Sequence, residues 1–446
     1  MNSQVEKAGI NGMPTEILGW VVKNFALRPH EAGYPVFAEV KRNKTNLVRL
    51  CRTSRGFRAA ATPFLYETVI LCRGRDLVLF LRSLAENPNL RPRVKHLACL
   101  INLKMSSETE GIEPSWEKLS PGITVSAPSD IHLFTLAGLA ATSLPGRIFT
   151  DAPRPPGKSD VRNLGERIFA SIVCLAVGLE SVLFQMPLQI ERQSSIRPGY
   201  VDKNRYVVAS NIISKTLLDP EIGQTVLQKL TTVKIQPDME NPSAVFGEAG
   251  DLGIRYDACP GIFTAPNVAA VEAFKESGGW EALPRGVKDV ALYGIIKPKT
   301  LGIICDYPKL ERLTIQPAMD EMEEAVLADD VFNTALAKVA PTLRYLDFQT
   351  LGNITLSKSY GPTMRLGSLV RLTQLENLSI EIFALFGTSE KIDQLTLADI
   401  VPGSLKNLIL TERWVRGDPI LSTERDKLGL EGLFANVGVK LTLEWF

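Results

Sequence analysis

The stretch LERLTI, residues 310–315, has apolar residues at its first, fourth and sixth positions. The same pattern returns in LRYLDF (343–348), LENLSI (375–380) and LKNLIL (405–410), at spacings of 33, 32 and 30 residues. Apolar residues two positions apart are typical of a strand that buries one face. Because the pattern recurs at a period of about 20 to 50 residues, it indicates a repeat architecture and decides the fold.

Earlier copies of this pattern stand at less regular spacing, in VKHLAC (94–99), LESVLF (179–184), LTTVKI (230–235) and VKDVAL (287–292). Helical segments at 321–340 and 389–401 precede two of the later strands. Units of a helix, a tight turn and a strand cannot bury their apolar faces alone, so they stack on one another. We therefore expect an α/β solenoid with a curved parallel sheet, which carries insertions rich in Pro, Gly and Ser at 104–160 and 236–280.

A short amphipathic helix is predicted near the amino terminus, after a flexible segment at 1–12. The segment MPTEILGWVVKNF (13–25) begins with a proline suited to a first helical turn, and an acidic residue follows that complements the helix dipole. Ile17, Leu18 and Val21 then recur at helical spacing. About twenty residues rich in turn formers come next.

A second helical stretch is LVRLCRTSRGFRAAATPFLYETVIL, residues 47–71. Its leucines and small residues fall on one helix face. Ser54, a good helix cap, predicts a break in the middle. Pro63 predicts the end of the helical part, and the β-branched residues that follow it predict a strand.

The charge of the chain is balanced overall and uneven along its length. The formal net charge is +1, but residues 1–100 hold 16 Lys and Arg against 7 Asp and Glu, and the remainder holds 34 against 42. This balance argues against a role on nucleic acid or on a membrane surface. Arginines recur every three residues from Arg49 to Arg58, without interleaved aromatic residues, so we favour a solvated helix face over a phosphate-binding stripe.

The residues that carry most enzyme chemistry do not form a known motif. There is no GxSxG, no GxxxxGK[ST] and no GxGxxG after a strand. The three histidines share no metal-ligand spacing with a cysteine. We expect no catalytic residue, metal or cofactor, and reduced, mostly buried thiols for the six cysteines, Cys51, Cys72, Cys99, Cys174, Cys259 and Cys305.

No segment of the sequence predicts membrane insertion. The most apolar run, IFASIVCLAVGL (168–179), is shorter than the ~20 residues that span a bilayer and predicts a buried helix. The first residues lack the apolar centre of a signal peptide. We expect a cytoplasmic or nuclear protein, or one present in both compartments.

The amino-terminal segments resemble an F-box, in the style of the divergent F-box proteins common in fungi. MPTEIL (13–18) resembles the LP-x-EIL opening of that family, and residues 47–66 resemble its L-x-x-L-x-x-x-S-R-x-F-R-x-x-x-x-P-x-L-Y continuation. Residues 79–97 resemble the segment that follows in those proteins. The resemblance implies a helical F-box domain at 13–71 and an irregular leucine-rich-repeat-like domain at 72–446.

The resemblance also implies a function, that of the substrate-recognition subunit of an SCF-type cullin-RING ubiquitin ligase. The F-box would bind the adaptor subunit and the repeats would bind a target protein, with chemistry left to other subunits. An F-box cannot fill a core of its own, so its apolar residues would stay partly exposed until the adaptor binds. The expected adaptor-binding residues are Met13, Pro14, Ile17, Leu18, Leu47, Leu50, Cys51 and Phe57.

Two departures and one alternative accompany this interpretation. Residues 26–44 form an insertion between helices that an F-box usually joins by a handful of residues, and Met13 stands where leucine is usual. A loop absorbs such an insertion at small entropic cost. The alternative is a protein-interaction scaffold outside any ligase, in which the F-box-like region only caps the first repeat.

Three aromatic residues lie near the ends of repeats, namely Trp280, Tyr293 and Trp414. Each of them would either bind a target or fill the core.

Overall fold

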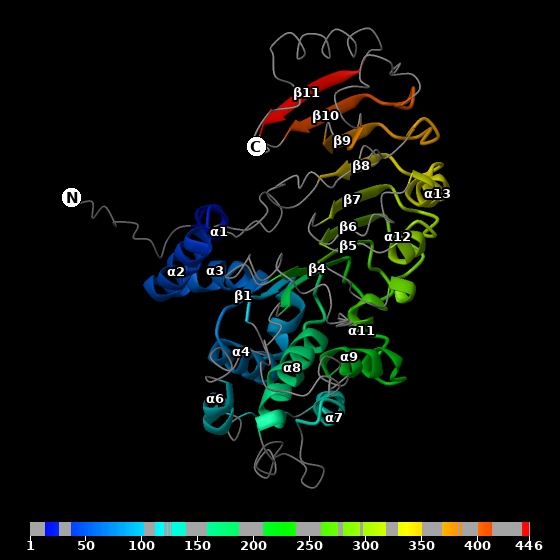
Figure 1. The fold of residues 1–446 in the computed structure, drawn as a ribbon. Helices are drawn as coiled ribbons and strands as arrows, with labels where there is room; N and C mark the ends of the chain where they lie inside the picture. Colours follow the sequence, from blue (N-terminus) through cyan, green and yellow to red (C-terminus); the bar gives the residue numbers. More distant parts are fainter. Residues whose placement is uncertain are drawn as a thin grey trace, which may run out of the picture. The chain divides into compact units, whose positions relative to one another are not determined.

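The protein is a mixed α/β molecule (Figure 1). The computed structural model describes residues 14–25, 37–101, 112–119, 123, 125, 127–139, 158–186, 208–237, 260–274, 280–294, 298–317, 329–349, 368–381, 384–385, 400–412 and 439–445. Contacts divide the chain into unit 1, which comprises Met1–Gln185 and Lys215–Leu230, and unit 2, which comprises Met186–Ser214 and Thr231–Phe446.

Unit 1 contains the amino-terminal helices and the first three strands. The division between the units falls near residue 185, and α3 leads directly into a strand that pairs with the next one along the chain. Its elements are α1 (Thr15–Lys23), α2 (Phe37–Thr53), α3 (Arg55–Glu67), β1 (Thr68–Leu71), α4 (Gly74–Glu86), η2 (Pro88–Arg93), β2 (His96–Cys99), α6 (Ile112–Leu119), α7 (Pro128–Leu136), α8 (Lys158–Leu175) and β3 (Ser181–Met186).

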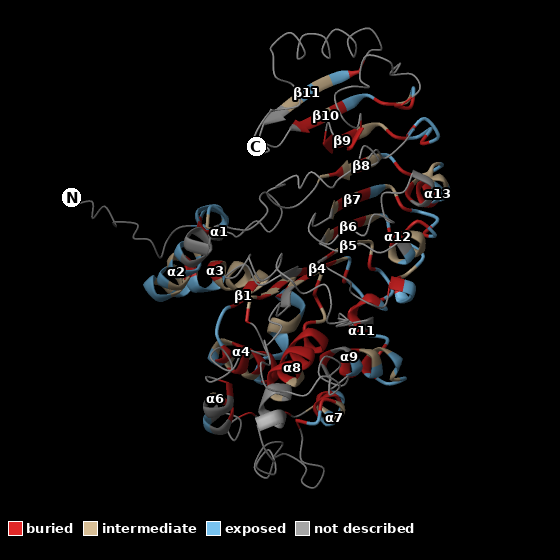
Figure 2. Ribbon diagram, viewed as in Figure 1, coloured by how far each residue is buried: buried red, intermediate tan, exposed pale blue. Residues whose placement is uncertain are grey.

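The core of unit 1 lies between its helices and its strands. β1, β2 and β3 pair in chain order and in parallel, with Val69 opposite Leu97 and Leu97 opposite Val182. α8 contacts α4, α6 and α7, and most of its described side chains, which begin at Leu164, are buried (Figure 2). The prediction of a buried helix in the apolar run 168–179 is confirmed as far as Leu175, where the helix ends.

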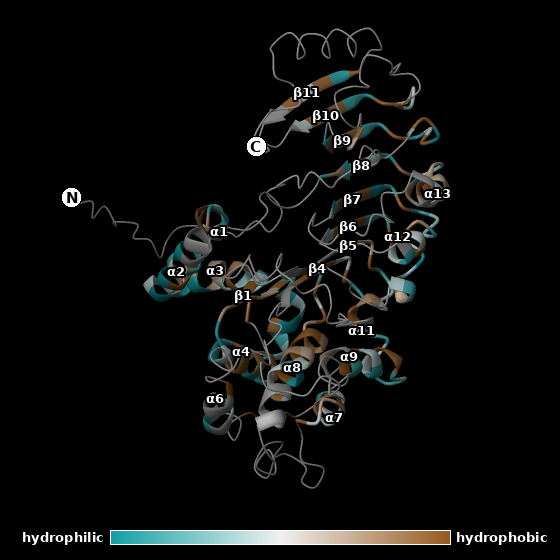
Figure 3. Cartoon of the chain, in the orientation of Figure 1, coloured by the Kyte–Doolittle hydropathy of each residue, from teal (hydrophilic) through white to brown (hydrophobic). Residues whose placement is uncertain are grey.

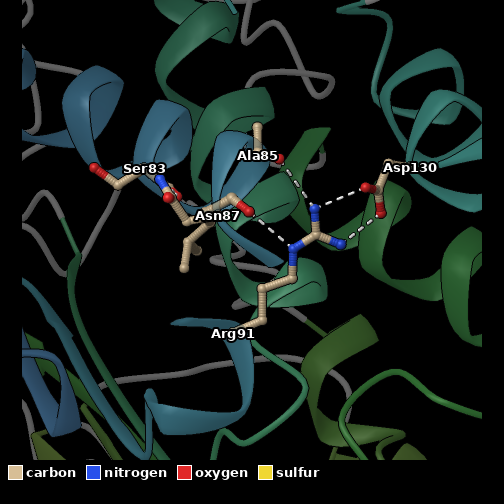
Figure 4. Close-up of polar contacts among 6 residues, drawn as sticks. Ser83, Ala85, Asn87, Arg91 and Asp130 are labelled. Carbon is tan, nitrogen blue, oxygen red and sulfur yellow. Dashed lines mark hydrogen bonds and ion pairs between the residues drawn. The ribbon is translucent and has the colours of Figure 1, made fainter. Parts of the chain in front are cut away.

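A buried ion pair joins two helical elements of unit 1 (Figure 4). The guanidinium of Arg91 donates from Nη1 and Nη2 to the two carboxylate oxygens of Asp130, at 2.7 Å each. Its Nε donates to the carbonyl of Leu84 at 2.8 Å, and Nη2 also reaches the carbonyl of Ala85. Arg91 thereby satisfies carbonyls at the end of α4, which have no partner within the helix, while it holds α7 in place.

Unit 2 contains eight described strands that pair in chain order, each parallel to the next. The prediction of a parallel sheet with intervening helices is confirmed. The strands are β4 (Thr232–Pro237), β5 (Ala270–Phe274), β6 (Asp289–Gly294), β7 (Arg312–Pro317), β8 (Tyr345–Phe348), β9 (Asn377–Glu381), β10 (Asn407–Glu412) and β11 (Lys440–Trp445), and the helical elements are α11 (Pro260–Phe263), η5 (Trp280–Ala282), α12 (Pro298–Ile304) and α13 (Asp329–Val339). α9 (Val208–Leu218) crosses the division between the units.

The apolar positions of the repeated pattern build the core of unit 2. In LERLTI, Leu310 is buried in the turn before β7, and Leu313 and Ile315 are buried on one face of that strand. α12 and α13 lie on one side of the strands (Figure 1). Phe332 of α13 meets Phe348 of β8 edge to face at 5.7 Å, so the buried face is the one that the helices cover. Apolar and polar residues both occur along these strands (Figure 3).

Two expectations about element boundaries need correction, and a third is confirmed. The helix predicted to end at Pro63 continues to Glu67, because the residues after the proline, Phe64 and Leu65, pack against the apolar cluster of the helices. The insertion expected at 26–44 is helical from Phe37, where α2 begins. The break at Ser54 is confirmed, since its hydroxyl accepts a hydrogen bond from the backbone N–H of Phe57 and caps α3.

The two insertions expected within the repeats contain regular structure. The segment 104–160 contains α6, α7 and the beginning of α8. The segment 236–280 contains α11 and the complete strand β5. Val268, Val271 and Ala273 give β5 the pattern of the other repeats, but its last apolar position is an alanine, which makes the pattern weak.

Candidate functional site

The helix α1 follows simple local rules. Pro14 precedes its first turn in an extended conformation, and its carbonyl accepts a hydrogen bond from the N–H of Leu18. Glu16 lies in the first turn and Lys23 in the last, so both charges complement the helix dipole. The helix has nine residues, whose side chains point either toward the neighbouring helices or toward the outside.

The helix α1 is apolar on both faces. Leu18 and Val22, four residues apart, are buried, with 3% and 0% of their surface exposed. Ile17, Trp20 and Val21, at helical spacing on another face, are 49%, 78% and 37% exposed. We call these three side chains the α1 apolar face.

The inner face of α1 belongs to a small core shared by three helices. Leu18 and Val22 cluster with Leu47 of α2 and with Phe57 and Ala61 of α3. Gly56 allows a close approach, because a Cβ at this position would lie 3.0 Å from Cδ1 of Leu18. The three helices therefore bury each other's apolar residues and still leave the α1 apolar face outside.

Large exposed apolar residues are concentrated on this helix. The described residues include five of them, and three form the α1 apolar face. The other two, Leu218 and Val370, stand alone on separate segments. Single exposed apolar residues are ordinary on protein surfaces, whereas a cluster that contains a tryptophan is typical of a binding surface.

The structure separates the expected adaptor-binding residues into two groups. Pro14 and Ile17 are exposed, and Leu50 and Cys51 are half-buried against the core of the helices. Met13 lies outside the described residues. The expectation of partly exposed side chains is wrong for Leu18 and Leu47, because α1, α2 and α3 bury them between one another. Phe57, another expected adaptor-binding residue, is buried in the same cluster.

Two residues of the surface, Trp20 and Val21, were not among the expected adaptor-binding residues. They lie three and four positions after Ile17, which is the spacing of neighbours on a helix face. That spacing alone indicates that Trp20 and Val21 share a helix face with Ile17. It does not indicate that this face is the exposed one, because Leu18 and Val22 form a second apolar stripe on the same helix.

The helices around this surface are basic. Among the described side chains of α1, α2 and α3, Glu16 is the one exposed acid. The exposed bases are Lys23, Arg42, Lys44, Arg49, Arg52, Arg55 and Arg58.

Metal ligands and reactive thiols are two features of many catalytic centres. Among the described residues, no group of three or more His, Cys, Asp or Glu side chains is placed to hold a metal ion. Burial raises the pKa of the Cys174 and Cys305 thiols to about 12, which keeps both protonated and unreactive at neutral pH. Nor does any helix in the described part of the chain combine the length and the apolarity needed to cross a membrane.

The aromatic residues considered for target binding differ in how far they are buried. Trp280 is buried, packs against Phe263 at 5.8 Å between ring centroids, and accepts a hydrogen bond from the Tyr307 hydroxyl at its backbone carbonyl. It is a core residue. Tyr293 is half-buried on β6, where burial and the nearby carboxylate of Glu272 raise the pKa of its hydroxyl. Trp414 lies outside the described residues.

The chain matches no protein-family model, and a search of curated proteins finds no match either.

Proposed function

We propose that this protein is the substrate-recognition subunit of an SCF-type cullin-RING ubiquitin ligase. In this proposal α1, α2 and α3 act as an F-box that binds the adaptor subunit, and the leucine-rich-repeat-like strands of unit 2 bind a target protein. The observation that carries the proposal is the α1 apolar face, which stays exposed on a helical cluster that buries Leu18 and Val22 of the same helix.

A partner that covered the α1 apolar face would remove its side chains from water. Apolar surface that leaves water favours binding, and truncation of a tryptophan at the centre of an interface typically costs on the order of 2–4 kcal/mol of binding free energy. A helix that served only as a cap would turn its apolar side chains toward the chain it covers. Instead, Trp20 has 78% of its surface in water, which favours an interface over a cap.

The target-binding part of the proposal rests on the sheet face opposite α12 and α13. Successive side chains of a strand point to opposite faces, so this face carries Arg312 while Leu313 is buried beneath the helices. Arg312 lies 4.7 Å from the ring centroid of Tyr345 on β8 and 3.6 Å from the carboxylate of Asp289 on β6. A polar and aromatic row of this kind suits the recognition of a protein surface.

Such a subunit positions the target protein and does not itself catalyse the transfer of ubiquitin. It would hold a target protein at high effective concentration near the conjugating enzyme, which raises the rate of transfer to target lysines. We propose no catalytic residue, cofactor or metal for this chain. The cytoplasm and the nucleus are the proposed compartments.

The test is co-expression of the full chain with the adaptor subunit, followed by size-exclusion chromatography. We expect the two proteins to co-elute, and we expect the double variant Ile17→Asp/Trp20→Ala to elute alone. Leu218→Ala is the matched control, because Leu218 is also a large exposed apolar residue and lies outside α1. Independent elution of a well-behaved wild-type chain would reject the ligase proposal and favour the interaction scaffold.

A further inference from the structure

The junction of α2 and α3 concentrates positive charge. Four exposed arginines, Arg49, Arg52, Arg55 and Arg58, surround the break at Ser54. Arg58 donates from Nε to the carbonyl of Cys51 at 3.2 Å, so it belongs to both helices. We call these four residues the junction arginines.

The charge at this junction opposes the stability of α3. The amino-terminal end of a helix carries a partial positive charge and favours acidic side chains. α3 has no acid in its first turn and instead begins with Arg55. A residue that breaks a local rule without a structural gain is a candidate for function.

The junction arginines also lack acidic partners within the described part of the chain. No ion pair there involves Arg49, Arg52 or Arg55. Glu67, at the end of α3, pairs instead with Lys95 at 2.9 Å. Among the described residues this positive charge is not balanced by an acid, and it is exposed where an oppositely charged surface would meet it.

We infer that the junction arginines bind an acidic surface of the adaptor, as a second contact beside the α1 apolar face; this inference rests on the proposed function. A protein partner is favoured because the apolar face stands on the same three-helix cluster. Single-stranded nucleic acid would require exposed aromatic side chains for base stacking. On α3, which carries Arg55 and Arg58, Phe57 is buried and Phe64 and Tyr66 are half-buried; the exposed Trp20 belongs to the α1 apolar face. Charges of this kind accelerate association and make it sensitive to salt.

The test is the affinity of the full chain for the purified adaptor at low and at high salt, about 50 and 500 mM. We expect Arg55→Glu combined with Arg49→Glu to weaken binding about tenfold at low salt, with a smaller difference at high salt. The control is Lys309→Glu combined with Arg371→Glu, which makes the same change of charge at two exposed positions of unit 2. The control should bind like the wild type.

A second readout separates a binding role from a structural one. Arg55→Glu places an acid in the first turn of α3, so the melting temperature of this variant should equal or exceed that of the wild type while adaptor binding weakens.

Equal affinity of the charge-reversed variant and the wild type at both salt concentrations would overturn this inference and leave the adaptor proposal standing. Absence of wild-type binding would overturn both. Binding of a labelled RNA or duplex DNA by the wild type, lost in the variant, would assign the junction arginines to nucleic acid instead.

Discussion

Arg91 and Asp130 lie 39 residues apart and meet through two hydrogen bonds of 2.7 Å, with 12% and 8% of their side chains exposed. The same guanidinium also donates to the carbonyls of Leu84 and Ala85 at the end of α4. One side chain therefore fixes the end of α4 and the position of α7. Loss of either partner leaves the other charge buried without compensation.

The first prediction concerns this pair. Asp130→Ala should lower the free energy of unfolding of unit 1 by about 3 kcal/mol, since it strands the Arg91 guanidinium. The double variant Arg91→Met/Asp130→Leu should lose less than the sum of the two single variants, because no charge stays buried. Urea unfolding followed by circular dichroism measures both. Additive losses would show that the two residues act independently.

The second prediction compares two glycines. A Cβ at Gly178 would lie 2.2 Å from the carbonyl oxygen of Pro92, which is backbone and cannot move aside, whereas a Cβ at Gly302 in α12 would meet nothing within 4 Å. Gly178→Ala should therefore destabilise the protein by about 2 kcal/mol or more. Gly302→Ala should stabilise it by about 0.5–1 kcal/mol, because alanine favours a helix. Thermal unfolding of the two variants tests the contrast, and equal effects would contradict it.

The sequence predicted the parallel sheet because each strand repeats a simple burial pattern. Leu310, Leu313 and Ile315 are spaced as a turn and a one-sided strand require, and all three are buried. β5 escaped prediction since its pattern ends in Ala273, which gives a weak signal. Local spacing also could not reveal that Glu67 and not Pro63 ends α3, because contacts with the other helices decide that boundary.

The candidate site was predicted only in part, for a physical reason. α1 is apolar on two faces, and helical spacing alone does not say which face packs inward. That choice depends on Leu47 and Phe57, which come from helices further along the chain. The sequence therefore located the helix and Ile17, but not Trp20.

The third prediction concerns alkaline pH. Burial raises the pKa of the Cys174 thiol from 9.0 to about 12, and the unfolded chain regains the ordinary value. A group whose pKa is higher in the folded state contributes stability below its unfolded pKa and loses that contribution as pH rises. The free energy of unfolding should thus fall between pH 9 and pH 12. Cys174→Ala should reduce this slope, which urea midpoints at several pH values would show; an unchanged slope would contradict the assignment.

The fourth prediction concerns acid. Nε2 of His132 on α7 lies 2.7 Å from the Asp219 carboxylate, and this contact holds the pKa of Asp219 below its ordinary value. A lowered pKa contributes stability above the unfolded pKa, and that stability is lost as pH falls through the folded pKa. Asp219→Ala should therefore unfold with less pH dependence in the acid range than the wild type. Circular dichroism during acid titration measures this, and His132→Ala should shift the curve in the same direction.

The fifth prediction separates the two faces of α1. Leu18→Ala should lower the free energy of unfolding by about 2–5 kcal/mol, because Leu18 is buried between three helices. Trp20→Ala should change stability by less than about 0.5 kcal/mol, because its side chain is mostly in water.

The same pair of variants tests what the outer face does in solution. The isolated wild-type chain should self-associate as its concentration rises, since the α1 apolar face has no partner, and Trp20→Ala should reduce this association. Static light scattering at several concentrations measures it, with Leu218→Ala as the control for an exposed apolar residue outside α1. If Trp20→Ala destabilised the fold as strongly as Leu18→Ala, then Trp20 would be a packing residue and the α1 apolar face would not be a docking surface.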